Sequence, residues 1–155
     1  ASKSDYPALF STMLTSFGPL RGSDVYPDIP RSNAFIGNFL RLEMLDLYGE
    51  EDAILREFTP YFDRMTRRTG TLWENNDPQA SCCHGFASYI CVLYAKIAFG
   101  YLGFDETNRS VLLRENFRFD GEARFPVPGG FANIKVANGK RSVSIPDGYE
   151  IKIVK

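Results

Sequence analysis

The residue types best suited to chemistry lie in one polar stretch, residues 69–86. This stretch holds the chain's only tryptophan, Trp73, and its only histidine, His84. Glu74 directly follows the tryptophan, so a flat apolar ring stands beside a carboxylate, which suits a sugar-binding site. Three side chains that can hydrogen-bond sugar hydroxyls come next: Asn75, Asn76 and Asp77. The alternative interpretation is a loop that caps the following helix and buries its tryptophan.

Apolar residues at helical spacing flank this loop on both sides. Asp77-Pro78 predicts a turn, and Ser81 predicts the N-cap of a long apolar helix with His84 in its first turn. We expect that helix over residues 82–102. Apolar spacing predicts three earlier helices, over residues 6–17, 33–48 and 51–67, with Ser32 capping the second. Pro60 should kink the third helix or mark where it really begins.

The loop lengths carry a geometric prediction. Only Gly49 and Glu50 separate the second and third helices, so these two should be antiparallel neighbours. The other two connections, residues 18–31 and 68–81, are long. If consecutive helices run up and down, both long connections lie at one end of the bundle. The polar residues that would then share one face are Arg21, Asp24, Asp28, Glu74, Asn75, Asp77 and His84.

The pattern changes to β-type alternation after about Gly103. This alternation begins in Val111–Arg114 and Asn116–Phe119. Asn138-Gly139 then predicts a tight hairpin in which Ile134 opposes Val143 and Ala132 opposes Ile145. A further strand is expected over residues 149–153. We therefore predict a mainly α chain with a β tail: an α domain over residues 1–103 and a small antiparallel β-meander or sandwich over residues 104–155.

Composition narrows the class of protein. The chain has 155 residues, 44% of them hydrophobic, and a formal net charge of −1, so it has no basic surface of the kind that nucleic acids need. The apolar run of residues 86–95 is too short to span a bilayer. Three cysteines, Cys82, Cys83 and Cys91, are expected in one helix, with spacing that matches no standard zinc site and no disulfide framework. We predict neither a metal nor a cofactor.

Three segments together give the chain a resemblance to bacterial α-L-rhamnosidases, which are six-hairpin glycoside hydrolases. They are Arg31-Ser32-Asn33-Ala34-Phe35-Ile36-Gly37-Asn38-Phe39-Leu40-Arg41-Leu42-Glu43, Thr69-Gly70-Thr71-Leu72-Trp73-Glu74-Asn75 and Ala80-Ser81-Cys82-Cys83-His84-Gly85-Phe86-Ala87-Ser88. The resemblance covers most of residues 5–155. One departure is Cys83, where a polar residue is expected.

The resemblance implies an (α/α)6 toroid followed by a β-sandwich, and hydrolysis of terminal α-L-rhamnosyl residues with inversion. It implies that Glu74 is the general base and that Trp73, Asn75 and His84 line the rhamnose subsite. No motif matches the family's general acid. Since about four helices are expected where the toroid has twelve, we expect a fragment of the catalytic domain that is inactive alone. Its missing remainder, or self-association, would cover the exposed apolar helix faces.

Two other functions stay open at the level of sequence. One is a non-catalytic carbohydrate-binding module that uses Trp73 and the neighbouring amides. The other is a helical interaction domain in which Trp73 is purely structural. For the glycosidase and for the carbohydrate-binding module, the expected partner is a rhamnose-containing glycoside or polysaccharide. We expect neither a nucleic acid nor a membrane as a partner. No secretory signal is visible at Ala1, but enzymes that degrade such polysaccharides are more often periplasmic or secreted than cytoplasmic.

Overall fold

The computed structural model describes residues 2–22, 25–29 and 35–154. The chain forms two compact units that divide between Tyr89 and Ile90. We call residues 1–89 the helical unit and residues 90–155 the β unit. Helices come first and strands follow, as the sequence predicts, and the strands form two small sheets. In the described part of the chain, no helix has both the length and the apolar character needed to cross a membrane.

The first helix, α1, spans Pro7–Ser16, within one residue of the prediction at each end. Its proline stands in the first turn, where the missing amide hydrogen costs no helical hydrogen bond. Phe10 is the buried residue of α1, and its ring meets the Tyr48 ring edge to face at 4.9 Å. This contact joins α1 to the end of the next helix.

Three α-helices and one π-helical segment make up the centre of the helical unit. They are α2 Phe35–Leu47, α3 Glu51–Glu57, η1 Phe58–Asp63 and α4 Arg64–Thr69. Pro60 lies in the π-helical segment, where the wider turn accommodates a residue without an amide hydrogen. The predicted cap Ser32, together with Asn33, lies outside the described residues. Gly49, at a left-handed φ of 73°, forms the short link between α2 and α3.

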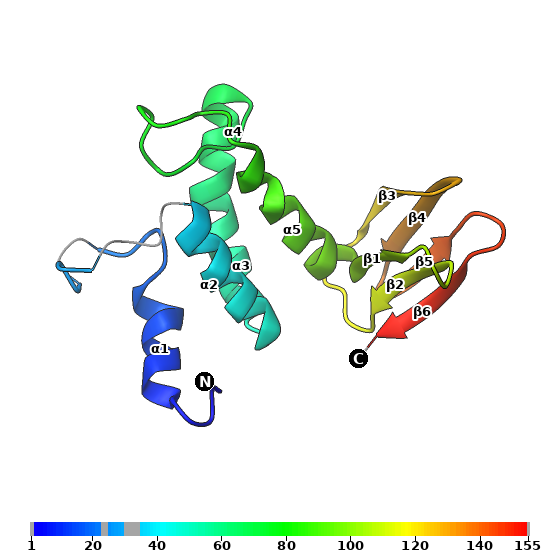
Figure 1. Ribbon diagram of the computed structural model, residues 1–155, viewed down its shortest axis with the longest axis horizontal. Coiled ribbons are helices and arrows are strands. Elements are labelled where there is room, and N and C mark those ends of the chain that lie inside the picture. The colour runs from blue at the N-terminus through cyan, green and yellow to red at the C-terminus, as the bar shows by residue number, and fades with distance from the viewer. Residues whose placement is uncertain (1, 23–24, 30–34, 155) are drawn as a thin grey trace. The chain divides into compact units, whose positions relative to one another are not determined.

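The antiparallel pairing of α2 with α3 is confirmed (Figure 1). Their shared interior contains Leu42 and Leu45 from α2, and Ala53 and Ile54 from α3. On the other side of α2, apolar side chains are exposed in the part of the chain that the structure describes. They are Ile36, Leu40 and Leu47, which are 59%, 61% and 78% exposed.

The predicted helix over residues 82–102 is wrong at both ends. Residues 81–84 are loop, a 3-10 turn spans Gly85–Ser88, and α5 spans only Tyr89–Phe99. Cys82 and Cys83 therefore lie in the loop, and only Cys91 lies in the helix; all three are free thiols. The chain leaves α5 through Gly100, at a φ of 69°.

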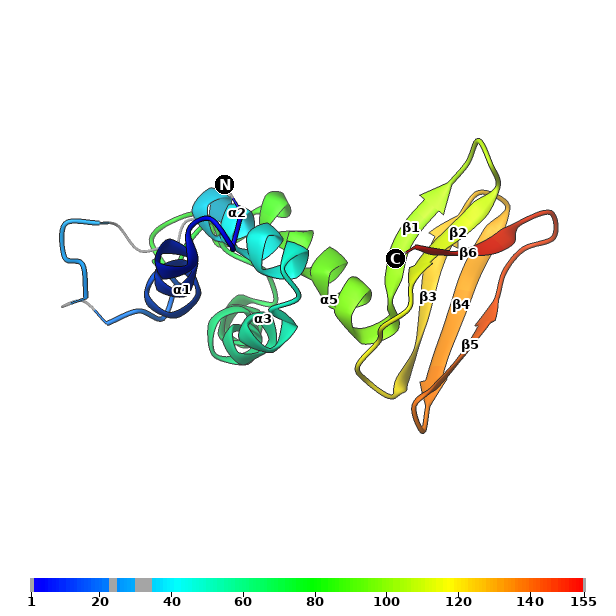
Figure 2. The same ribbon diagram turned by 90° about the horizontal axis from the view of Figure 1, so that it is seen from below.

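Six strands form two three-stranded sheets in the β unit (Figures 1 and 2). They are β1 Tyr101–Asp105, β2 Ser110–Arg114, β3 Gly121–Val127, β4 Gly130–Ala137, β5 Lys140–Ser144 and β6 Glu150–Val154. The sheet orders are β1-β2-β6 and β3-β4-β5. The core that the two sheets share contains Val111, Leu113, Val127, Ala132 and Ile134.

The predicted hairpin is confirmed, with Asn138 and Gly139 both at positive φ and Ile134 opposite Val143. The ladder ends at Asn133 opposite Ser144, so the predicted Ala132–Ile145 pair falls outside it. The simple meander is wrong, because β6 leaves the hairpin sheet and pairs with β2 in parallel. Two further corrections concern strands: residues 116–119 form none, whereas β3 was not predicted.

Candidate functional site

The Trp-Glu loop, residues 70–84, is held closed by its own backbone. Gly70 ends α4 in the left-handed conformation and starts the loop. The amide of Glu74 donates to the carbonyl of Ser81 at 2.8 Å, and the amide of His84 donates to the carbonyl of Leu72 at 2.9 Å. The Thr71 hydroxyl donates to the Cys82 carbonyl. These bonds bring the segment that carries Trp73 and Glu74 against the segment that carries His84.

Trp73 is buried at the base of the loop, with 1% of its surface exposed. Its indole nitrogen donates to the Thr69 hydroxyl at 2.8 Å. The guanidinium carbons of Arg64 and Arg68 lie 5.7 Å and 5.6 Å from the ring centroid, within reach of a cation–π interaction. In this chain the indole offers no open face to a sugar, and it fixes the backbone from which Glu74 projects.

Glu74 is half-buried, so its carboxylate can be reached by solvent. Its backbone is fixed on one side by the bond to Ser81 and on the other by the buried Trp73. The loop therefore fixes the backbone of Glu74 and leaves its carboxylate open to water or a ligand. A general base must come within hydrogen-bond reach of the water that it deprotonates.

The residues after Glu74 form two turns stabilised by side chains. Oδ1 of Asn75 accepts the Asp77 amide at 2.7 Å, and Oδ1 of Asp77 accepts the Gln79 amide at 2.9 Å. The amide group of Asn75 and Oδ2 of Asp77 are the atoms these bonds leave for a ligand. The side-chain oxygen of Asn76 is buried and has no hydrogen-bond partner among the described residues.

His84 is half-buried and directly precedes the 3-10 turn, so it does not lie within a helix as predicted. The predicted N-cap at Ser81 is also wrong, because the Ser81 hydroxyl donates to the Cys83 carbonyl at 3.3 Å inside the loop. The backbone pairing with Leu72 nonetheless brings His84 next to the segment of Glu74. Loop closure, and not a helix start, therefore gathers the predicted residues.

Other residues of the predicted face have other surroundings. Asp24 lies outside the described residues, and Asp28 is exposed. Arg21 closes its own loop, since its guanidinium donates to the Ile29 carbonyl and lies 5.4 Å from the Phe17 ring centroid. Among the described residues, no group of three or more His, Cys, Asp or Glu side chains could hold a metal ion.

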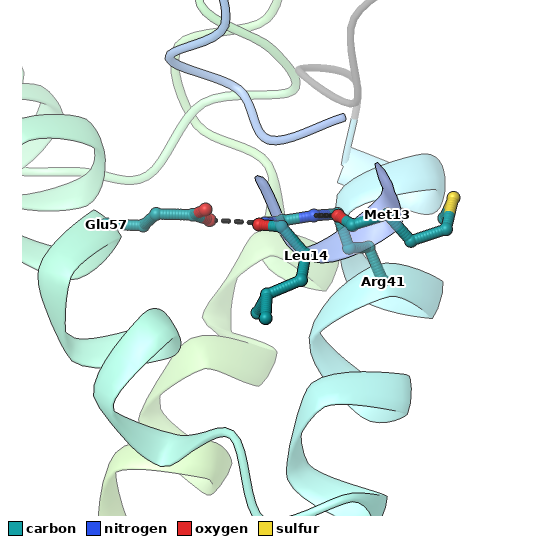
Figure 3. Close-up of polar contacts among 4 residues, drawn as sticks. All are labelled: Met13, Leu14, Arg41 and Glu57. Carbon is teal, nitrogen blue, oxygen red and sulfur yellow. Dashed lines mark hydrogen bonds and ion pairs between the residues drawn. The ribbon is translucent and has the colours of Figure 1, made fainter. Parts of the chain in front are cut away.

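Arg41 is the residue whose importance the sequence analysis missed. Its guanidinium is buried and donates to the carbonyls of Met13 and Leu14, both at 2.9 Å, and to Glu57 at 2.7 Å (Figure 3). It thereby joins the last turn of α1, the middle of α2 and the end of α3. The available signal was a charged residue between Leu40 and Leu42 on an otherwise apolar helix.

The chain was compared with protein-family models, with curated proteins and with solved structures, and none of the three comparisons found a match. The half-buried Glu74, on a fixed backbone, can accept a proton from water. Neighbouring amide and imidazole groups can bind hydroxyls.

Proposed function

We propose that this chain supplies the general-base half of an inverting glycoside hydrolase site of the α-L-rhamnosidase type. Glu74 is the base, and Asn75 and His84 bind the sugar. The observation that supports this most is the closed loop that holds the half-buried Glu74 between the buried Trp73 and the segment of His84. Trp73 contributes by fixing the Glu74 backbone, in place of the stacking surface that the sequence predicts.

In the proposed reaction, Glu74 accepts a proton from water while the oxygen of that water forms a bond to the anomeric carbon. The bond from that carbon to the leaving oxygen breaks, and a general acid donates its proton to that oxygen. Inversion requires the two carboxyl groups to lie about 6.5–9.5 Å apart, with the water beside the base. We propose that the acid comes from a segment outside this chain, so the chain alone is inactive.

The proposal includes a partial (α/α)6 toroid, of which the helical unit contributes some hairpins. The exposed apolar side of α2 supports it: Ile36, Leu40 and Leu47 are each more than half exposed. Such a stripe on a soluble protein marks a surface that another element covers. Further helices of the same toroid, or a second copy of this chain, would cover it.

Aryl α-L-rhamnoside hydrolysis tests the proposal. The isolated chain should show no turnover. In the complete active protein, Glu74→Gln should lower kcat by about 10²–10⁴-fold, because proton transfer by a positioned group contributes on that order. The same protein with Glu74→Ala should regain turnover with azide and yield the rhamnosyl azide of inverted configuration. Glu115→Gln, a matched change at an exposed acid of the β unit, should leave kcat unchanged.

Two results would contradict the assignment. Unchanged hydrolysis by Glu74→Gln in the complete protein would remove Glu74 as the base. Turnover by the isolated chain that Glu74→Gln abolishes would show that the acid lies within residues 1–155.

A second candidate is a helical interaction domain with no sugar chemistry, and the burial of Trp73 favours it. As the only tryptophan, Trp73 reports directly on its loop. In the glycosidase proposal, L-rhamnose should change its emission, and His84→Ala should remove the change. Emission that L-rhamnose leaves constant, with no rhamnose-induced shift in the amide signals of Glu74 and Asn75, would favour the interaction domain.

A further inference from the structure

Three connections in the β unit surround a pocket of about 790 Å³. They are the β1–β2 turn with Glu106 and Arg109, the β3–β4 turn with Pro128 and Gly129, and the β5–β6 connection, residues 145–149. We call this the turn pocket. It draws on both sheets, and the three connections can be followed in Figures 1 and 2. Pockets formed by loops on a rigid sheet scaffold are frequent ligand sites.

The walls of the turn pocket are fixed to one another. The Glu150 amide donates to the Arg109 carbonyl at 2.9 Å, and the Tyr149 amide donates to the Pro146 carbonyl at 3.2 Å. A Cβ on Gly148 would lie 3.1 Å from Nη1 of Arg109, so the guanidinium rests on that backbone. A Cβ on Gly130 would lie 3.1 Å from Pro146, so the start of β4 also touches the β5–β6 connection. A ligand would meet a preorganised surface.

The side chains of the turn pocket combine two chemistries. Glu106 and Asp147 accept hydrogen bonds, and Arg109 donates them; all three are exposed. The apolar side chains are Pro128, Ile145, Pro146 and Tyr149, of which the last three are half-buried. Two carboxylates and one guanidinium give the pocket a net charge of −1, which disfavours an anionic ligand.

We propose that the turn pocket binds a neutral saccharide. Sugar hydroxyls both donate and accept, so they match Glu106 and Asp147 on one side and Arg109 on the other. The C–H faces of a pyranose ring match the ring of Tyr149 and the two prolines. The site lies in the β unit, and it does not depend on the assignment of Glu74.

Amide NMR spectra of the full chain test the proposal. The probes are neutral saccharides, namely L-rhamnose, cellohexaose and xylohexaose, with digalacturonate as an anionic comparison. At least one neutral saccharide should shift the signals of Arg109, Gly129 and Gly148. Asp147→Asn should then raise the dissociation constant of that saccharide about tenfold, since the free energy of a hydrogen bond to a charged group corresponds to about this factor. Glu115→Gln should leave the constant unchanged, and unshifted signals of Val111 and Ile134 will show that each variant folds.

Four outcomes would overturn the turn-pocket proposal. The first three are no shift with any neutral saccharide, shifts with digalacturonate alone, and unchanged affinity in both Asp147→Asn and Glu106→Gln. Shifts confined to Glu74, Asn75 and His84 would also overturn the turn pocket while supporting the proposed glycosidase site. The two proposals therefore fail separately.

Discussion

Nη1 of Arg41 lies 2.7 Å from Oε2 of Glu57, and the Arg41 side chain is 1% exposed whereas that of Glu57 is 15% exposed (Figure 3). A charge buried this deeply is tolerated only when its hydrogen bonds are made. Glu57 and the carbonyls of Met13 and Leu14 together provide them. The pair therefore fixes where α1, α2 and α3 meet.

Arg41→Met should destabilise the helical unit by about 3 kcal/mol. The change keeps most of the side-chain volume but leaves Glu57 and two carbonyl oxygens without their donor. Urea unfolding followed by the emission of Trp73 measures the effect. Arg67→Met is the matched control, because the 2.6 Å ion pair of Arg67 with Asp63 is on the surface. It should cost no more than about 0.5 kcal/mol. Equal losses in both variants would contradict the burial argument.

Gly18→Ala should destabilise the same unit by about 1–3 kcal/mol. A Cβ at Gly18 would lie 2.7 Å from Oε1 of Glu57 and 3.3 Å from Cζ of Arg41, and the ion pair keeps both from moving aside. In a protein that already carries Glu57→Ala, Gly18→Ala should cost much less stability than it costs in the wild type. A double-mutant cycle measures this difference. Gly85→Ala, with nothing within 4 Å of its Cβ, is the control and should be nearly neutral.

The sequence predicts those features that local pattern determines. The first helix follows from its apolar spacing, and the hairpin follows from Asn138-Gly139, whose two residues adopt the positive φ that such turns need. The Trp-Glu loop between two helical segments is also present, close to its predicted position. In each case the interactions that fix the structure connect residues close in the chain.

Other features depend on partners distant in the sequence. Tyr101 continues an apolar run that starts in α5, and periodicity alone cannot tell that this segment is a strand. The parallel pairing of β6 with β2 joins segments 40 residues apart, as in the pair Ser110–Glu150. The burial of Trp73 has a local cause that apolar spacing does not predict, because the contacts of its indole with Arg64, Arg68 and Thr69 are specific to these side chains.

Thr69→Val should destabilise the helical unit by about 1–2 kcal/mol, because it leaves the buried indole N–H of Trp73 without its 2.8 Å acceptor. Thr69→Ser keeps the hydroxyl and should lose less than about 0.5 kcal/mol. The free energy of unfolding in urea distinguishes the two variants. A Thr69→Val variant as stable as the wild type would contradict the role of this hydrogen bond.

The helical unit should lose stability in alkali through Tyr61. Burial raises the pKa of Tyr61 from 10.0 to about 12, an effect that the nearby charge of Arg64 partly offsets. Below pH 10 both states keep the phenolic proton. Between pH 10 and 12 the unfolded state loses it first, so stability falls as pH rises, by about 2–3 kcal/mol in all. Urea midpoints at several pH values measure the slope, and Tyr61→Phe should flatten it. An equal slope in Tyr61→Phe would assign the effect to another group.

The uncovered side of α2 should make the chain self-associate and bind a hydrophobic dye. Leu40 and Leu47 are 61% and 78% exposed, so Leu40→Lys with Leu47→Lys removes apolar surface without touching the interior. We expect dye fluorescence to fall by roughly half and light scattering to report smaller particles. Leu45→Lys, at a fully buried position, should instead unfold the helical unit and raise dye binding. A wild-type chain that stays monomeric and binds no dye would mean that α2 needs no partner.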